Sequence, residues 1–168
     1  RLTALGFSLD AWAFHPQLPE VVDLARAFPA ANIIMGHCGA PLGYGRYAGK
    51  REEVFATWKA GVRALAECGN VVMKLGGMMM RLASYDYGAA PAPLSSEELA
   101  RHWRPWIEPC IELFGASRCT FESNFPVDKM GIGYAALWNA FKHIAAGASA
   151  SEKADLFAGT ARRAYRLA

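Results

Sequence analysis

Four short, mostly apolar segments alternate with longer segments of helical periodicity along this chain, and that order limits the folds it can adopt. The pattern predicts strands at residues 5–14, 32–37, 70–77 and 119–125, and helices at 18–28, 50–67, 95–114, 134–146 and 150–167. Strand and helix repeated in this way are typical of a parallel sheet covered by helices. We therefore expect one α/β domain over residues 1–168, built from four βα units and a terminal helix.

Two of the predicted helices begin at capping sequences. Ser95 with Glu98, and Ser149 with Glu152, have the spacing of a capping box, in which each residue satisfies a free backbone N–H group of the other. A loop rich in Ala, Pro and Gly, at about 83–94, precedes the first of these helices.

Four βα units fit either a small doubly wound sheet or half of an eight-stranded barrel of the TIM type. A dinucleotide-binding doubly wound sheet would carry a Gly-rich phosphate loop after its first strand. The segment "FHPQLPE" after the first predicted strand has no such loop, and Pro41 interrupts the helix start in "HCGAPLGYG" after the second. The sequence therefore favours the half barrel.

Composition argues against several other classes of protein. The net charge is +3 and the basic residues are scattered, so we expect no nucleic-acid partner. No run approaches the ~18 apolar residues of a membrane span, and no leader opens the chain, so we expect neither a membrane segment nor a signal peptide. The four cysteines form no Cys-x-x-Cys pair and lie in apolar segments, as in a reduced, cytoplasmic protein.

Every predicted strand carries a polar group at or near its C-terminal end. Strand alternation predicts one polar face made of Ser8 and Asp10; Ile33, Met35 and His37; Val72, Lys74 and Gly76; and Thr120, Glu122 and Asn124. Burying such groups without partners is costly, and pairing them in one pocket removes that cost. Because barrel enzymes collect their chemistry at these strand ends, we expect a shared site there.

Three of these side chains have the chemistry of catalysis or metal binding. His37 can bind a metal or act as an acid or base. Lys74 can polarise a carbonyl or hold a substrate anion. Glu122 can serve as a general base, as a metal ligand, or only as the ionic partner of Lys74.

Four further residues are candidates for the rim of the site. Asn124 can orient a water molecule or a substrate oxygen. Asp128, in the loop beyond Pro126, can be a base or simply a turn residue. His15, after the first strand, and Asp10, within it, can contact the substrate.

Several motifs of the chain resemble the amidohydrolase 2 family of TIM-barrel, metal-dependent hydrolases. "NIIMGHCGAP" is similar to the family's His-x-Gly-x-Pro segment, and "NVVMKLGGM" to its next strand, which carries a Lys followed by small residues. "RCTFESNFPVD" resembles the last barrel strand, and "ASEKADLFAGTARRAYRL" the closing helix. The resemblance covers nearly the whole chain and places it as the C-terminal half of the barrel, strands five to eight.

This resemblance implies a divalent metal such as zinc, with His37 and Glu122 among its ligands. The family's first strand supplies a His-x-His ligand pair, which this sequence does not contain. The resemblance therefore implies either a fragment or a family member without its N-terminal half. Such a half would be inactive alone and would pair with another copy or with the missing half.

Two residues depart from the family pattern in the last strand. The family has an Asp, acting as base or metal ligand, where this chain has Asn124, and a Gly where it has Glu122. Our hypothesis is that Glu122 replaces the lost carboxylate, with Asp128 as the alternative.

The expected function is hydrolysis, by activated water, of a lactone, ester or amide of a small, carboxylated substrate. Metal-assisted decarboxylation within the same family and a non-catalytic remnant are the alternatives.

Overall fold

The computed structural model describes residues 1–79 and 93–167 and contains one parallel sheet. Its strands are β1 (Ser8–Ala11), β2 (Asn32–Met35), β3 (Val71–Leu75) and β4 (Cys119–Phe121), hydrogen-bonded in the order β1-β2-β3-β4. Neighbours in the sheet are thus neighbours in the sequence, without the reversal of strand order that a doubly wound sheet shows. The structure confirms the prediction of consecutive parallel βα units.

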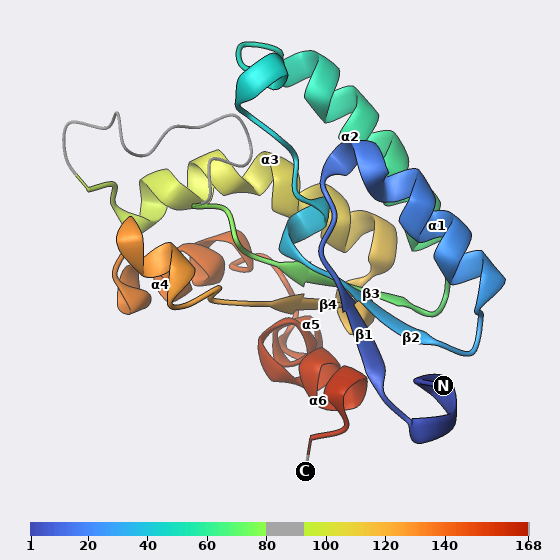
Figure 1. Cartoon of the computed structure of the whole chain (residues 1–168). Coiled ribbons are helices and arrows are strands. Elements are labelled where there is room, and N and C mark those ends of the chain that lie inside the picture. Colours follow the sequence, from blue (N-terminus) through green and yellow to red (C-terminus); the bar gives the residue numbers. More distant parts are fainter. Residues whose placement is uncertain (80–92, 168) are drawn as a thin grey trace.

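The helices lie where the sequence predicts them. They are α1 (Leu18–Ala27), α2 (Arg51–Ala66), α3 (Ser96–Phe114), α4 (Tyr134–Ile144), α5 (Ala150–Ala154) and α6 (Thr160–Tyr165). Both capping boxes are present, before α3 and before α5. In Figure 1, α1, α2 and α3 lie over one side of the sheet, and α5 and α6 lie beside β4.

Some boundaries differ from the predictions. The first strand is shorter than 5–14, since a 3-10 turn occupies Thr3–Leu5 and another follows at His15–Gln17. The helix predicted at 150–167 is interrupted by a π-helical turn, Asp155–Gly159, in which the backbone hydrogen bonds join residues five positions apart instead of four. The loop predicted at 83–94 lies outside the described residues, apart from positions 93 and 94.

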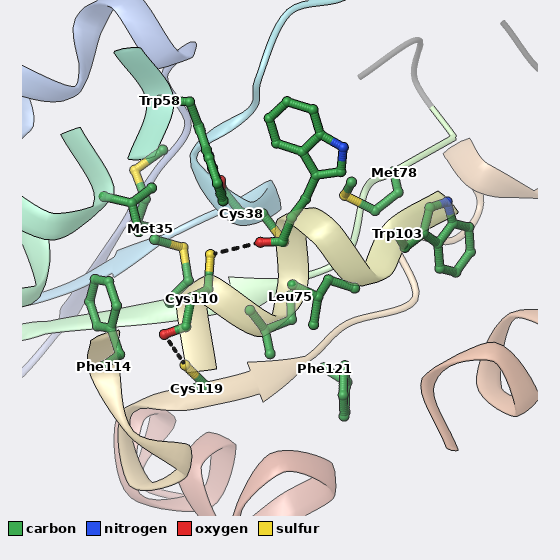
Figure 2. Packing of buried hydrophobic residues seen from close by; sticks show 14 of the residues in the cluster. Met35, Cys38, Trp58, Leu75, Met78, Trp103, Cys110, Phe114, Cys119 and Phe121 are labelled. Atoms are coloured by element: carbon green, nitrogen blue, oxygen red, sulfur yellow. Dashed lines mark hydrogen bonds between the residues drawn. The ribbon is translucent and has the colours of Figure 1, made fainter. Parts of the chain in front are cut away.

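A core of apolar, aromatic and sulfur-containing side chains fills the space between the sheet and helices α1 to α4 (Figure 2). Trp58, Trp103 and Trp106 are almost completely buried in it, and the flexible side chain of Met78 is packed among them. All four cysteines are buried and free. Among the described residues, no helix is long and apolar enough to cross a membrane.

The register of β2 corrects the predicted polar face. Ile33 pairs with Val71 and Met35 with Met73, so Ile33 and Met35 belong to the core face. Ile34 instead pairs with Asp10 of β1, and it occupies the polar face that was predicted for its two neighbours. The error came from extending strand alternation through His37, which lies beyond the end of the strand.

Candidate functional site

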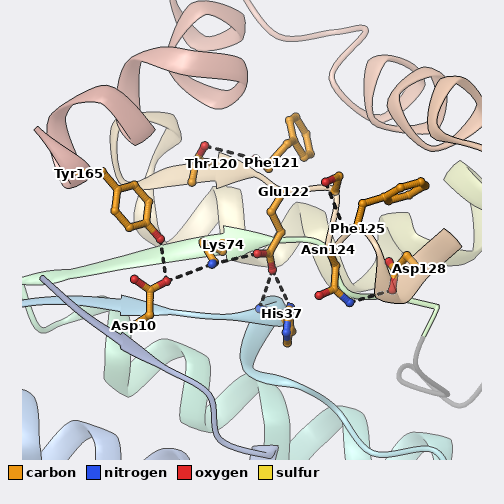
Figure 3. A network of polar contacts seen from close by, with 11 residues as sticks. Asp10, His37, Lys74, Thr120, Phe121, Glu122, Asn124, Phe125, Asp128 and Tyr165 are labelled. Atoms are coloured by element: carbon orange, nitrogen blue, oxygen red, sulfur yellow. Dashed lines mark hydrogen bonds and ion pairs between the residues drawn. The ribbon is translucent and has the colours of Figure 1, made fainter. Parts of the chain in front are cut away.

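Side chains from β1 and β3, and from the segments that directly follow β2 and β4, meet at the C-terminal ends of the strands in a chain of ionic contacts (Figure 3). The Lys74 ammonium lies 3.0 Å from Asp10 Oδ1 and 3.0 Å from Glu122 Oε2. The other oxygen of Glu122, Oε1, lies 2.6 Å from Nδ1 of His37 and accepts the His37 backbone N–H at 3.2 Å. The structure thus brings together four of the predicted site residues.

His37 reaches this cluster through an unusual backbone and not through strand alternation. The φ angles of His37 and Cys38 are 55° and 53°, in the left-handed region that non-glycine residues seldom adopt. The indole of Trp58 donates a hydrogen bond of 2.6 Å to the Cys38 carbonyl, which holds the turn from inside the core. The turn directs the imidazole toward Glu122.

Two glycines after β3 leave the space that this cluster needs. A Cβ atom on Gly76 would collide with the backbone oxygen and side chain of Glu122, and one on Gly77 would collide with the ring of His37. Gly77 also has a φ of 67°, which glycine adopts without strain. Glycine is therefore required at both positions, because Glu122 and His37 lie too close to the backbone for any side chain to fit.

The charges in the cluster stabilise one another. Burial alone would lower the pKa of the Lys74 ammonium, but Glu122 and Asp10 raise it above its ordinary value. Burial alone would raise the pKa of Glu122, but His37 and Lys74 hold it below the ordinary value. Glu122 is therefore a fixed carboxylate with both oxygens engaged.

Asp128 occupies a very different environment. It lies in the 3-10 turn Val127–Met130, is 1% exposed, and accepts a hydrogen bond of 2.8 Å at Oδ1 from Asn124. Oδ2 is buried without a hydrogen-bond partner in the described part of the chain. Burial raises the pKa of Asp128 to about 6, although the Asn124 amide, the His37 ring and the Met79 backbone N–H each act to lower it.

Asn124 is thus a partner of a carboxyl group. Its φ of 51° places it in a left-handed turn beyond the end of β4, so strand alternation no longer decides where its side chain points. The amide faces Asp128, four positions along the chain, and not Glu122. Figure 3 shows the Asn124–Asp128 pair beside His37, separate from the Lys74 contacts.

The sequence did not reveal one member of the cluster, Tyr165. Its hydroxyl donates a hydrogen bond of 2.7 Å to Asp10 Oδ1, the same oxygen that Lys74 contacts. Burial, with this hydrogen bond, raises the pKa of the Tyr165 phenol to about 12. Local pattern could not predict this contact, because it joins α6 to β1 across nearly the whole length of the chain.

His15 lies apart from the cluster. It is buried, its Nδ1 accepts the Leu42 backbone N–H at 3.2 Å, and its ring lies edge-on to Tyr47. Burial and the nearby Arg46 guanidinium lower the pKa of His15. Within the described structure these contacts give His15 a structural role, and none of them joins it to Lys74 or Glu122.

The described residues do not by themselves make a metal site. No group of three or more His, Cys, Asp or Glu side chains among them is arranged to hold a metal ion. Glu122, predicted as a ligand, uses one oxygen for Lys74 and the other for His37, which in turn commits its Nδ1 to Glu122. Any metal would need donors from elsewhere.

Comparison with known proteins gives a consistent family assignment. A family model described as "Amidohydrolase" matches residues 1–167. An uncharacterised protein, y4mH, from Sinorhizobium fredii is 35% identical over 99% of this chain and 50% of its own length. The L-fucono-1,5-lactonase of Burkholderia multivorans is 28% identical over 99% of this chain and 53% of its own.

Solved structures agree in fold. An amidohydrolase from Burkholderia multivorans with bound zinc matches 99% of this chain and 55% of its own, with a TM-score of 0.84 and 28% identity. A putative 2-pyrone-4,6-dicarboxylic acid hydrolase from Pseudomonas putida, 19% identical with a TM-score of 0.70, shares the fold over 99% of this chain and 54% of its own. The chain spans about half the length of the relatives it matches, and it corresponds to the C-terminal half of their barrels.

Proposed function

Because the chain belongs to the amidohydrolase family, we propose that it supplies one half of the active site of a hydrolase that opens a lactone ring with water. The support from relatives is the lactonase of Burkholderia multivorans, 28% identical over 99% of this chain. The observation that carries the proposal is the carboxyl group of Asp128, which is buried, has a pKa raised to about 6, and has an Oδ2 without a hydrogen-bond partner among residues 1–79 and 93–167.

Asp128 is the group best suited to accept a proton from the attacking water. A general base works best when its pKa lies near the operating pH, and burial moves the pKa of Asp128 in that direction. Asn124 holds Oδ1, which leaves Oδ2 as the oxygen able to accept the proton. Asp128 therefore takes the role for which Glu122 was the first sequence-based hypothesis.

The ionic cluster would position the groups around the reacting carbonyl. Glu122 fixes the ring of His37 through Nδ1 and the His37 backbone N–H, which leaves Nε2 as the ring nitrogen able to face the substrate. Lys74 keeps Glu122 ionised and in place. Zinc is bound in the Burkholderia structure, and binding it here would require ligands beyond the described residues of this chain.

The substitution Asp128→Asn tests this assignment in the natural polypeptide that contains this sequence. We expect turnover of a sugar 1,5-lactone to fall by about 10²–10⁴-fold, the usual loss when a general base is removed, while thermal stability at neutral pH does not decrease. Asp23→Asn, at an exposed position of α1, is the matched control and should leave turnover unchanged. Normal turnover in Asp128→Asn would show that Asp128 is not the general base.

Product analysis separates the alternatives. Ring opening yields one hydroxy acid per lactone consumed and no gas, whereas a decarboxylase releases CO₂ from a carboxylated substrate. A natural polypeptide that turns over neither kind of substrate, with or without added zinc, would support a non-catalytic role.

A further inference from the structure

The turn after β2 carries His37 on an unfavourable stretch of backbone. His37, Cys38 and Ala40 have φ angles of 55°, 53° and 41°, and Gly39, between the last two, has a φ of 70°. Left-handed φ angles are unfavourable for residues with a Cβ atom, and they persist only where surrounding contacts hold them. The contacts of this turn therefore decide where the His37 ring points.

Contacts from three separate segments hold the turn. Glu122, after β4, accepts the backbone N–H of the first residue, His37, at 3.2 Å. The backbone N–H of His15, in the 3-10 turn after β1, donates to the carbonyl of the last residue at 3.1 Å. Between these two, the indole N–H of Trp58 in α2 donates to the Cys38 carbonyl at 2.6 Å. The Trp58 contact thus holds the left-handed residue that directly follows His37.

The indole of Trp58 is fixed in its direction by the core. The side chain is fully buried, and its ring packs against the rings of Phe55 and Trp106 at centroid distances of 5.5 and 4.9 Å. Its nitrogen lies so close to Gly39 that a Cβ atom there would come within 3.5 Å of it. Because Cys38 is fully buried too, relaxation of the turn would separate two buried polar groups, which is costly. The Trp58 hydrogen bond therefore opposes that relaxation.

We propose that Trp58 is a positioning residue for His37. Its N–H holds the Cys38 carbonyl and so maintains the left-handed turn, and the turn keeps the His37 ring against Glu122, with 2.6 Å between Nδ1 and Oε1. The inference rests on the proposed function, in which Nε2 of His37 faces the substrate, and it makes turnover depend on a core residue of α2 that acts through the turn. Without the N–H, the turn relaxes toward negative φ and the ring leaves Glu122.

NMR of the natural polypeptide reports the position of the His37 ring without a substrate. Glu122 is an ionised carboxylate that can only accept, so Nδ1 of His37 donates the hydrogen bond between them. We expect a slowly exchanging Nδ1 proton signal in the wild type at neutral pH, assigned by its absence in His37→Asn. In Trp58→Phe, which lacks the indole N–H, this signal should be lost to exchange with water.

Trp106→Phe is the matched control, because it removes the same indole from the same core. Trp106 is fully buried, its ring lies 4.9 Å from that of Trp58, and its N–H has no hydrogen-bond partner in the described part of the chain. We expect Trp106→Phe to lower the melting temperature, as truncation in a core does, and to leave the His37 signal in place.

Trp58→His distinguishes the hydrogen bond from packing. The imidazole ring superposes on the five-membered ring of indole, so its Nε2–H can occupy the position of the indole N–H. Histidine fills an apolar core less well than phenylalanine, so a packing role alone would make Trp58→His the more damaging substitution. We expect the opposite order, with the His37 signal retained in Trp58→His and lost in Trp58→Phe. The spectra are compared at a temperature where circular dichroism shows every variant to be folded.

Kinetics connect the position of the ring to turnover of a sugar 1,5-lactone. Because a small displacement of a catalytic group slows the chemical step, Trp58→Phe should lower kcat by about 10–100-fold and leave KM nearly unchanged. Trp58→His should recover most of this loss, and Trp106→Phe should keep the kcat of the wild type. Equal losses of kcat in Trp106→Phe and Trp58→Phe, or a Trp58→His variant that is worse than Trp58→Phe, would overturn the inference.

These measurements separate the inference from the proposed function. If the wild type opens lactones and Trp58→Phe keeps both its kcat and the His37 signal, Trp58 is not a positioning residue and the proposed function stands. If Trp58→Phe loses the signal and Trp58→His restores it, but the wild type opens no lactone, the proposed function fails and the role of Trp58 in placing the His37 ring stands.

Discussion

Two carboxyl groups leave the same strand end, six residues apart, and the fold treats them in opposite ways. Glu122 lies between an ammonium and an imidazole, and its pKa is held below the ordinary value. Asp128 is buried against the neutral amide of Asn124, without a lysine or arginine contact among the described residues, and its pKa is raised to about 6. Burial raises the pKa of both carboxyl groups, so the difference between their pKa values comes from the charged neighbours.

The two carboxyl groups are therefore suited to different roles. A carboxylate with both oxygens paired and a lowered pKa positions its neighbours and resists protonation. A carboxyl group with an unpaired oxygen and a pKa near neutrality can exchange a proton during a reaction. Changes to the neighbours of Glu122 should therefore act on stability, and changes to Asp128 should act on turnover and on pH dependence.

The largest effect on stability is expected from Lys74→Met, which removes the cation between Asp10 and Glu122. Loss of one partner leaves Glu122, whose side chain is 13% exposed, as a buried charge without its ammonium. We expect the free energy of unfolding at pH 7 to fall by about 3 kcal/mol. Chemical denaturation by urea, followed by circular dichroism, measures it.

Lys50→Met is the matched control for Lys74→Met. Lys50 forms an ion pair of 3.5 Å with Glu53, but both side chains are more than half exposed. Such exposed pairs contribute about 0–1 kcal/mol. A similar loss in both variants, or no loss in Lys74→Met, would show that the Glu122 cluster behaves as an ordinary surface ion pair.

The sequence predicted the elements of this site better than their geometry. The order of strands and helices, both capping boxes and the meeting of Asp10, Lys74, Glu122 and His37 followed from periodicity and from the convergence of parallel strand ends. These features are local or follow from topology, so pattern is enough to predict them.

The rest depended on backbone turns and on contacts distant in sequence. Left-handed φ angles at His37 and Asn124 redirect both side chains after their strands have ended. Alternation therefore misassigned Ile33 and Met35, and it placed Asn124 on the face of Glu122, whereas the Asn124 amide contacts Asp128. The opposite pKa shifts of Glu122 and Asp128 depend on which charges surround each group, and spacing along the chain does not contain that information.

The second prediction concerns the pH dependence of stability. Burial raises the pKa of Asp128 from 3.8 to about 6, so the folded protein binds this proton more tightly than the unfolded chain. The stability that the protonated form contributes is fully present below pH ~4 and is lost as the pH rises through ~6. Asp128→Asn avoids this loss and should be more stable than the wild type by about 1–2 kcal/mol at pH 7.5.

The advantage of Asp128→Asn should shrink toward zero at pH 4, where the wild-type carboxyl is protonated as well. Thermal melts of both proteins between pH 4 and 8 measure it. Glu122→Gln should behave in the opposite way, with a loss that is largest at neutral pH and decreases in acid, because the pKa of Glu122 is lowered. If the stability of Asp128→Asn and of Glu122→Gln, each relative to the wild type, changed with pH in the same direction, the proposed difference between the two carboxyl groups would be wrong.

The smallest effect is expected from Tyr165→Phe, which removes the hydrogen bond from α6 to Asp10. Asp10 is 47% exposed and keeps its contact with Lys74, so the expected loss is about 0.5–1 kcal/mol. The phenol, with its pKa raised to about 12, remains a donor up to pH 10, so the loss should be constant from pH 6 to 10. Tyr44→Phe, at an exposed position, is the control. Tyr165 contacts the Lys74 cluster and not the Asn124–Asp128 pair. The change in stability caused by Asp128→Asn should therefore be the same in the wild type and in the Tyr165→Phe variant at every pH. A different change in the two backgrounds would mean that Asp128 is energetically coupled to the cluster around Asp10 and Lys74.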